Sequence, residues 1–222
     1  MSTSGTRKPK VGIIGSGAVA QALGRGFASS GHETKLGSRT PDSEKVRAWV
    51  AATGMGASSG TFAEAAAFGE VLVIATLGSA VGEAIALAGP THFGGKLVID
   101  TTNPLDFSKG MPPGLFLGIT DSLGEVVQRK LPSAKVVKCF NTVPSGQMFK
   151  PTFADVEMLI CGNDKIAKGQ VANLLQEFGW EGTIDIGGID GARWLEALVP
   201  LWVRTCTALK SRNVVFKALR TP

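Results

Sequence analysis

The sequence predicts an α/β fold, a doubly wound and mainly parallel sheet with a short helical extension at its C-terminal end. Short apolar runs rich in β-branched residues alternate along the chain with longer stretches of helical periodicity. The connections between them are short, and no linker or internal repeat divides the 222 residues. With 44% hydrophobic and 18% charged residues, the chain has enough apolar side chains for a sizeable core.

Most of the predicted elements lie in the N-terminal two thirds of the chain. Residues 1–9 are polar, and we expect them to form a disordered tail. The predicted strands are the apolar runs at residues 11–14, 32–36, 71–75, 96–100 and 135–138. The predicted helices lie between them, at residues 18–29, around 46–50, at 79–88 and at 122–131. The β-branched run at residues 71–75 is typical of a strand buried on both faces of a parallel sheet.

Local signals mark the first helix and one long loop. In the helix, Val19, Leu23 and Phe27 recur at four-residue spacing on one face, and Gly31 follows as a typical C-terminal cap. Residues 102–119 are rich in proline and glycine and therefore predict a loop. A loop of this length beside a sheet edge is more often a binding loop than a plain connection.

The C-terminal part repeats the alternation. It contains a predicted strand at residues 156–161, a helix at 164–178, a strand at 183–186 and a helix at 193–210. Because no linker precedes this part, we treat residues 10–190 as one domain. Residues 191–222 are then a helix and a tail packed on that same domain.

The last predicted helix is unusually apolar. It carries Trp194, Leu195, Leu198, Leu201 and Trp202, and Pro200 within it predicts a kink. An apolar stripe of this kind usually marks a partner surface, so we predict a homodimer with this helix at the interface. The alternative is that the helix completes the core of the monomer.

Composition excludes several classes of function. The net charge of +5 is too small and too dispersed to predict nucleic-acid binding. The three cysteines are widely spaced without a CxxC pair, so we expect no metal site and reduced thiols in a cytoplasmic protein. The first ten residues contain no apolar run, so no signal peptide is predicted. Glycines and Glu83 interrupt the most apolar window, residues 71–89, which argues against a membrane span.

A glycine motif follows the first predicted strand and opens the first helix. It is a G-x-G-x-x-A pattern with the residues Gly15, Ser16, Gly17, Ala18, Val19 and Ala20. In this context Gly15 allows a tight turn, and Gly17 lets the backbone approach a pyrophosphate at the helix N-terminus. The motif predicts a Rossmann-type dinucleotide site. The alternative is a glycine turn that binds nothing.

The end of the second predicted strand selects the dinucleotide. A protein that prefers NAD carries an acidic residue about twenty positions after the motif, but residues 35–40 contain none. They offer Ser38, Arg39 and Thr40, whose guanidinium and hydroxyl groups suit a 2′-phosphate. We therefore predict NADP(H) as the cofactor. The alternative for Arg39 is an ordinary surface arginine.

Further contacts to the cofactor are expected where later strands end. Thr76 and Leu77 follow one strand, Asn103 follows the next, and Asn141 follows the one after. For the segment around Asn103, a capped turn without a ligand is the alternative. The chain has no tyrosine, and its two histidines lie away from the expected edge, so we predict no catalytic side chain and no metal ligand. A water or Lys138 stays open as a proton donor.

Several segments resemble the F420-dependent NADP reductase family. They are residues 11–17, 37–39, 100–104, 136–143, 185–188 and 192–196, so the resemblance covers nearly the whole chain. It implies reversible hydride transfer between NADP(H) and the deazaflavin coenzyme F420 in a homodimer. It also implies that Ser38 and Arg39 hold the 2′-phosphate and that residues 16–19 hold the pyrophosphate. Residues 137–142 also resemble the cytoplasmic reductase domain of six-transmembrane metalloreductases, which pass hydride from NADPH to a flavin.

The sequence thus predicts an NADP-dependent oxidoreductase whose second substrate is F420 or a flavin. Transfer between two carriers needs orientation and a dry pocket more than an acid or base, which fits the missing catalytic side chain. One alternative is an NADPH-dependent reductase of another small molecule, such as an imine or hydroxyacid dehydrogenase. Those enzymes usually add a long helical domain, whereas about thirty residues remain here after the last strand. The other alternative is a non-catalytic NADP-binding sensor.

Overall fold

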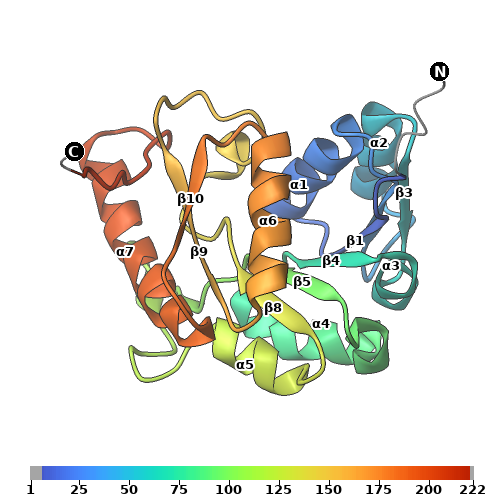
Figure 1. Ribbon diagram of the computed structural model, residues 1–222, viewed down its shortest axis with the longest axis horizontal. Helices are drawn as coiled ribbons and strands as arrows, with labels where there is room; N and C mark the ends of the chain where they lie inside the picture. The colour runs from blue at the N-terminus through green and yellow to red at the C-terminus, as the bar shows by residue number, and fades with distance from the viewer. Residues whose placement is uncertain (1–6, 221–222) are drawn as a thin grey trace.

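An eight-stranded sheet organises the fold of the computed structural model, which describes residues 7–220 (Figure 1). Its strand order is β10-β9-β8-β5-β4-β1-β2-β3. The strands are β1 (Val11–Ile14), β2 (Thr34–Gly37), β3 (Ala57–Gly60), β4 (Val71–Ile74), β5 (Leu97–Asp100), β8 (Lys135–Lys138), β9 (Glu157–Gly162) and β10 (Gly182–Asp185). Neighbouring strands pair parallel except β8 and β9, which pair antiparallel. The predicted mainly parallel sheet is confirmed.

Helices cover both faces of the sheet, as a doubly wound fold requires. They are α1 (Ala18–Ser29), α2 (Glu44–Thr53), α3 (Phe62–Phe68), α4 (Val81–Ala88), α5 (Leu123–Lys130), α6 (Lys165–Glu177) and α7 (Ala192–Ala208). Two large apolar clusters form most of the core, and a small third one contains Cys161, Ala192 and Leu195. One large cluster contains Ile13 and residues of α1, α2 and α6, and the other large cluster contains Ile14 and residues of α3, α4 and α5. Successive residues of β1 therefore face opposite layers.

The segment between β2 and β4 contains two elements that are absent from the sequence-based prediction. Strand β3 has the sequence Ala-Ser-Ser-Gly, so it lacks the apolar pattern of a strand and lies at the edge of the sheet. Helix α3 begins with a capping box, in which the Thr61 hydroxyl accepts from the Glu64 amide and the Glu64 carboxylate accepts from Thr61. This T-x-x-E pattern is the sequence signal that would have located the helix.

The predicted long loop at residues 102–119 contains a short antiparallel hairpin. Its strands are β6 (Leu105–Asp106) and β7 (Gly114–Leu115). Four large apolar side chains of the segment are exposed, namely Phe107, Met111, Phe116 and Ile119. The hairpin stands beside the carboxyl ends of the parallel strands, because it follows β5 directly.

Helix α7 is one continuous helix with Pro200 inside it. Its residues Leu195 and Val199 are buried, whereas Trp194 is 61% and Leu201 52% exposed. Trp202 instead donates through its ring nitrogen to the carbonyl of Val214 at 2.7 Å. The apolar set predicted for one interface is therefore divided between the protein interior, the C-terminal segment and the surface.

The N-terminal tail differs from its prediction over residues 7–9, while residues 1–6 lie outside the described residues. Arg7 forms an ion pair with Glu70 at 2.7 Å, and this guanidinium lowers the pKa of Glu70 to about 2. The carbonyl of Pro9 accepts from Nδ1 of the buried His32 at 2.8 Å. These partners are far away in sequence, so a polar composition alone did not reveal them.

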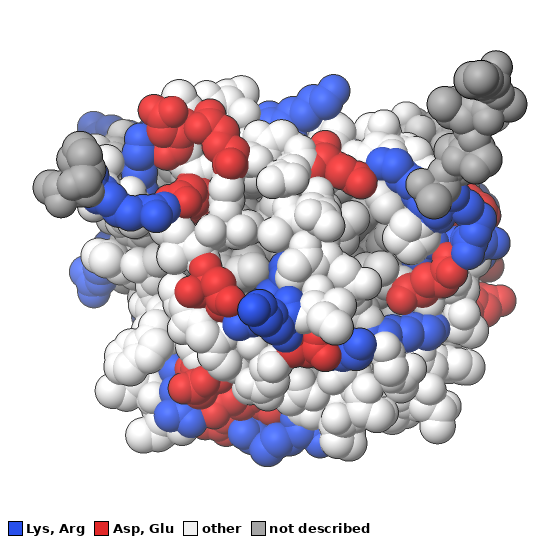
Figure 2. Space-filling view, in the orientation of Figure 1, with Lys and Arg blue, Asp and Glu red and all other residues white. Residues whose placement is uncertain are grey.

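The surface carries both signs of charge. On the face shown in Figure 2, lysine and arginine side chains are interspersed with aspartate and glutamate. Within residues 7–220 no helix is long and apolar enough to cross a membrane.

Candidate functional site

A cleft of about 690 Å³ opens at the carboxyl ends of the parallel strands. Its position follows from the strand order, because β2 and β4 lie on opposite sides of β1 and leave a crevice there. All the predicted cofactor-binding residues except Asn141 line it: Gly15, Ser16, Gly17, Ala18, Val19, Ser38, Arg39, Thr40, Thr76, Leu77 and Asn103. The tertiary structure thus brings together segments that are up to about 90 positions apart.

The glycine motif forms the turn between β1 and α1. Gly15 has a φ of +139°, and a Cβ there would lie 2.2 Å from the carbonyl oxygen of Ala75, so a side chain does not fit. A Cβ on Gly17 would meet no atom of the described residues within 4 Å. Gly17 is also the N-cap of α1, and no described side chain caps that end of the helix. The amides of this end are available to an anion in the cleft.

The end of β2 presents hydroxyl groups and a guanidinium. The Ser38 hydroxyl lies 3.2 Å from that of Ser16 and accepts from the Thr40 amide at 3.1 Å. These contacts fix the backbone of residues 38–40 at the mouth of the cleft. The exposed guanidinium of Arg39 makes no hydrogen bond or ion pair with the residues that the structure describes. It can therefore pair with a phosphate.

The ends of β4, β5 and β8 form the other half of the site. The Thr76 hydroxyl is buried there and has no hydrogen-bond partner among the described residues. Asn103 lines the cleft and is hydrogen-bonded to Asn141, which lies behind it and is 7% exposed. Asn141 is thus the one predicted residue that does not reach the cleft surface itself.

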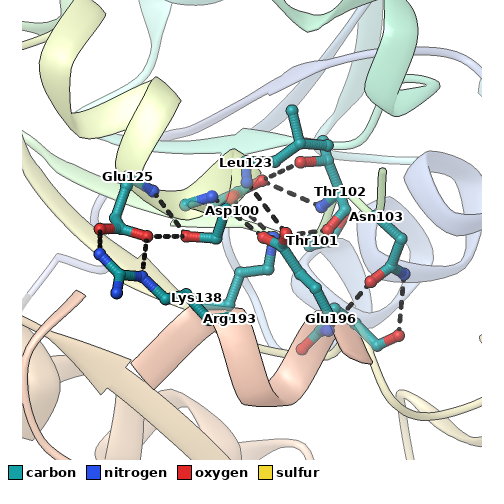
Figure 3. A network of polar contacts seen from close by, with 12 residues as sticks. Asp100, Thr101, Thr102, Asn103, Leu123, Glu125, Lys138, Arg193 and Glu196 are labelled. Atoms are coloured by element: carbon teal, nitrogen blue, oxygen red, sulfur yellow. Dashed lines mark hydrogen bonds and ion pairs between the residues drawn. The ribbon is translucent and has the colours of Figure 1, made fainter. Parts of the chain in front are cut away.

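A buried charged cluster supports the loop that carries Asn103 (Figure 3). Lys138, at the end of β8, donates to the carboxylate of Asp100 at 2.9 Å and pairs with Glu196 of α7 at 2.6 Å. Its ammonium also donates to the carbonyl of Thr102 at 2.5 Å. Asp100 in turn accepts from the amide and hydroxyl of Thr102 at 2.9 and 2.7 Å. These contacts hold residues 100–102 in one conformation beneath the cleft.

Lys138 does not serve as the proton donor that the sequence analysis left open. Its side chain is fully buried and does not line the cleft, and its three donors point to oxygen atoms of Asp100, Thr102 and Glu196. Burial lowers the pKa of this lysine, but the carboxylates of Asp100 and Glu196 outweigh it and hold the pKa above its ordinary value. Lys138 therefore stays protonated and acts as a structural cation.

Glu196 is a site-supporting residue that sequence reasoning missed. Besides Lys138, its carboxylate accepts from the amides of Leu123 and Gly124, at the N-terminus of α5, at 2.9 and 3.0 Å. Burial raises the pKa of Glu196, and Lys138 opposes that effect. A glutamate inside the apolar stretch of residues 193–210 is the signal that could have marked it, because a charge in such a position needs a buried partner.

The walls of the cleft are apolar around the end of β4 and the hairpin. Leu77 is 75% and Phe107 54% exposed, and Leu105 lies beside them. Among the lining residues, Arg39 and Glu83 are the charged ones, and none is a histidine, cysteine or lysine. In the described part of the chain no three histidine, cysteine or acidic side chains gather to hold a metal ion. The cleft can therefore bind a phosphorylated and partly apolar ligand but offers little acid–base chemistry.

Comparison with known proteins finds relatives among reductases. Residues 10–104 match the family model described as NADP oxidoreductase, coenzyme F420-dependent. The chain is similar to the metalloreductase STEAP3 of Rattus norvegicus, with 30% identity over 90% of this chain and 39% of that protein. It is also similar to the F420-dependent NADP reductase of Methanocaldococcus jannaschii, with 33% identity over 54% of each chain. The chain thus spans about half the length, or less, of these two relatives.

A solved structure matches over nearly the full length of this chain. It is the crystal structure of a candidate F420-dependent NADP reductase from Arthrobacter sp. FB24, with 37% identity and a TM-score of 0.91. The match covers 96% of this chain and 100% of that one. The two folds are therefore alike from the glycine turn to the C-terminal helix.

Proposed function

Because the chain belongs to the family of coenzyme F420-dependent NADP oxidoreductases, we propose that it transfers hydride between NADP(H) and a deazaflavin or flavin carrier. One observation carries this proposal. The cleft combines an uncapped helix N-terminus and a free guanidinium, which suit phosphates, with apolar walls on which the described residues place no histidine, lysine or cysteine. Such a site suits a reaction that consists of hydride transfer alone.

The residues present fit NADP(H) along the cleft. The turn at Gly15 to Val19 would hold the pyrophosphate, because the space above Gly17 is open. Residues Ser38 to Thr40 would hold the 2′-phosphate at the end of β2. Since β4 and β5 lie on the other side of β1, the nicotinamide half would extend toward Thr76 and Asn103. When bound, NADPH supplies the hydride.

The second substrate is proposed to be a planar carrier of the F420 or flavin type. A carbonyl or imine substrate normally needs a side chain that donates a proton in the transition state. The described lining offers Glu83 and Arg39 as charged groups, and the exposed Leu77 and Phe107 flank the same opening. Apolar walls exclude water and accept the face of a flat ring. The family description supports F420 over a flavin.

The experiment that tests this function is a direct turnover assay. The protein is mixed with NADPH and with either F420 or FMN, and the absorbance bands of NADPH and of the carrier are followed. Consumption of NADPH with reduction of one carrier is the expected result. Tight NADPH binding without turnover of any carrier would favour the sensor alternative. In a parallel assay an imine or a ketone replaces the carrier, and turnover in that assay alone would favour the alternative of another small substrate.

The preference for NADP(H) is expected to depend on Arg39. We expect Arg39→Ala to weaken NADPH binding by about 1–3 kcal/mol and NADH binding far less, because only NADPH carries the 2′-phosphate. Binding of both cofactors is measured by titrating the change in their fluorescence. Arg25→Ala, which removes an exposed arginine outside the cleft, is the matched control. Equal losses for NADPH and NADH would contradict a phosphate-binding role for Arg39.

We also propose a homodimer through α7, in a cytoplasmic protein that keeps its three thiols reduced. The support is the exposed pair Trp194 and Leu201, which lie seven residues apart and so on one side of the helix. Light scattering is expected to give twice the monomer mass of 23.0 kDa, and Trp194→Glu to give a folded monomer. Leu87→Glu, at an exposed leucine of α4, should leave the dimer intact. A monomeric wild-type protein would refute the dimer.

A further inference from the structure

Asn103 and Asn141 form a reciprocal pair at the edge of the cleft. The side-chain amide of Asn141 donates to Oδ1 of Asn103 at 3.0 Å, and the amide of Asn103 donates to the backbone carbonyl of Asn141 at 3.0 Å. A backbone carbonyl can only accept, so the second bond fixes which end of the Asn103 side chain carries the NH₂ group. The first bond then fixes the orientation of Asn141 as well. The two hydrogen bonds therefore fix the orientation of both side-chain amides.

Two unfavourable features lie at this pair. Phe140, which precedes Asn141, is buried and has a φ of +64°, a conformation that bulky residues rarely adopt. The Oδ1 atom of Asn141 is buried and has no hydrogen-bond partner among the described residues. The first feature lies in the residue before Asn141, and the second lies on the side chain of Asn141 itself. Strain that gathers at a ligand cleft points to a functional constraint.

The locked amide of Asn103 still has unused hydrogen-bonding capacity. A primary amide offers two N–H donors and two lone pairs on its oxygen, and the pairing with Asn141 uses one of each. One donor and one lone pair remain on a side chain that lines the cleft. The nicotinamide half of NADP(H) carries a carboxamide and ribose hydroxyl groups, which need both a donor and an acceptor. The strand order places Asn103 on the side opposite the residues suited to the 2′-phosphate.

We infer that Asn141 is a positioning residue: it holds the amide of Asn103 in the orientation that receives the nicotinamide half of NADP(H). This inference rests on the proposed function. Asn141 acts through Asn103 because it is 7% exposed and does not line the cleft. The competing interpretation is that the pair ties the end of β5 to the end of β8 and affects stability alone. The two interpretations differ in what they predict for shortened ligands and for the double variant.

The test compares the affinities of four proteins for two ligands. The proteins are the wild type, Asn141→Leu, Asn103→Ala and the double variant, and the ligands are NADPH and 2′-phospho-ADP-ribose, which lacks the nicotinamide. We expect each single variant to bind NADPH about 10-fold more weakly and 2′-phospho-ADP-ribose within about 2-fold of the wild type. We expect the double variant to bind NADPH no more weakly than Asn103→Ala, because Asn141 acts through that residue.

Two further variants keep the test decisive. Thr53→Val removes the buried unpartnered hydroxyl of α2, outside the cleft, and should leave both affinities unchanged. Asn141→Ser replaces Asn141→Leu if the latter does not fold, since serine adds no bulk.

Additive losses in the double variant, equal losses for both ligands, or unchanged NADPH binding by Asn141→Leu would each overturn the inference while the proposed function stands. A wild type that binds NADPH and 2′-phospho-ADP-ribose with the same affinity would also overturn the inference, because the nicotinamide would then contribute nothing to binding. A wild type that binds neither ligand would overturn both.

Discussion

Replacing Gly17 with valine is expected to abolish the binding of NADPH and NADH while the protein stays folded. The Cβ position of Gly17 faces open space in the cleft, and the residue has an extended backbone conformation that valine also adopts. The added side chain would fill the volume that a pyrophosphate needs above the end of α1. We expect a loss of more than about 100-fold in affinity, or about 2.8 kcal/mol. Titration of both cofactors, with a thermal melt of the variant, measures the two effects.

Two other glycines supply the controls for this experiment. Gly169 is exposed on α6 and also has open space around its Cβ position, so Gly169→Val should fold and bind like the wild type. Gly15→Val should instead damage the fold, because its Cβ would lie 2.2 Å from the carbonyl oxygen of Ala75 at a φ of +139°. If folded Gly17→Val bound NADPH like the wild type, the glycine turn would not be the phosphate site.

Replacing Lys138 with methionine is expected to lower the free energy of unfolding by about 3–5 kcal/mol at neutral pH. Methionine fills a similar volume but has no ammonium group. Asp100 and Glu196 would therefore stay buried without a compensating positive charge. Urea denaturation of the wild type and the variant measures the difference. Lys168→Met is the matched control, since its partner Asp185 is about half exposed, and it should cost about 1 kcal/mol or less.

The pH dependence of the unfolding free energy of Lys138→Met tests whether the buried carboxylates cause the loss of stability. Burial already raises the pKa of Glu196 in the wild type, and the loss of Lys138 removes the main opposing charge, leaving the hydrogen bond from the Leu123 amide. A carboxyl group whose pKa is raised by folding destabilises the protein increasingly as pH rises from its unfolded pKa toward its folded one. The stability deficit should therefore shrink as the pH falls from 7 toward about 4.5, and Glu196→Gln added to Lys138→Met should recover part of it. A deficit that is below about 1 kcal/mol and independent of pH would contradict this account.

Much of the cleft was predictable because its signals are local. The G-x-G-x-x-A motif predicts its own turn, since a φ of +139° at Gly15 is a conformation that favours glycine and can therefore be read from one residue. The absence of an acid around Ser38 and Arg39 is equally visible in the sequence. Buried strands such as β4 and helices such as α1 follow from hydrophobic periodicity within one element. The edge strand β3 lacks that periodicity, which is why it was missed.

The sequence by itself determined the alternation of strands and helices, the glycine turn and the chemistry at the end of β2. Tertiary structure alone decided which groups support the site. Glu196 accepts from Leu123, 73 positions away, and Lys138 donates to Asp100, 38 positions away. Such pairings depend on the order of strands in the sheet and on where α7 packs, and no local pattern encodes either. The same holds for Asn141, whose place behind Asn103 exists because β5 and β8 are neighbours although 34 residues separate them along the chain.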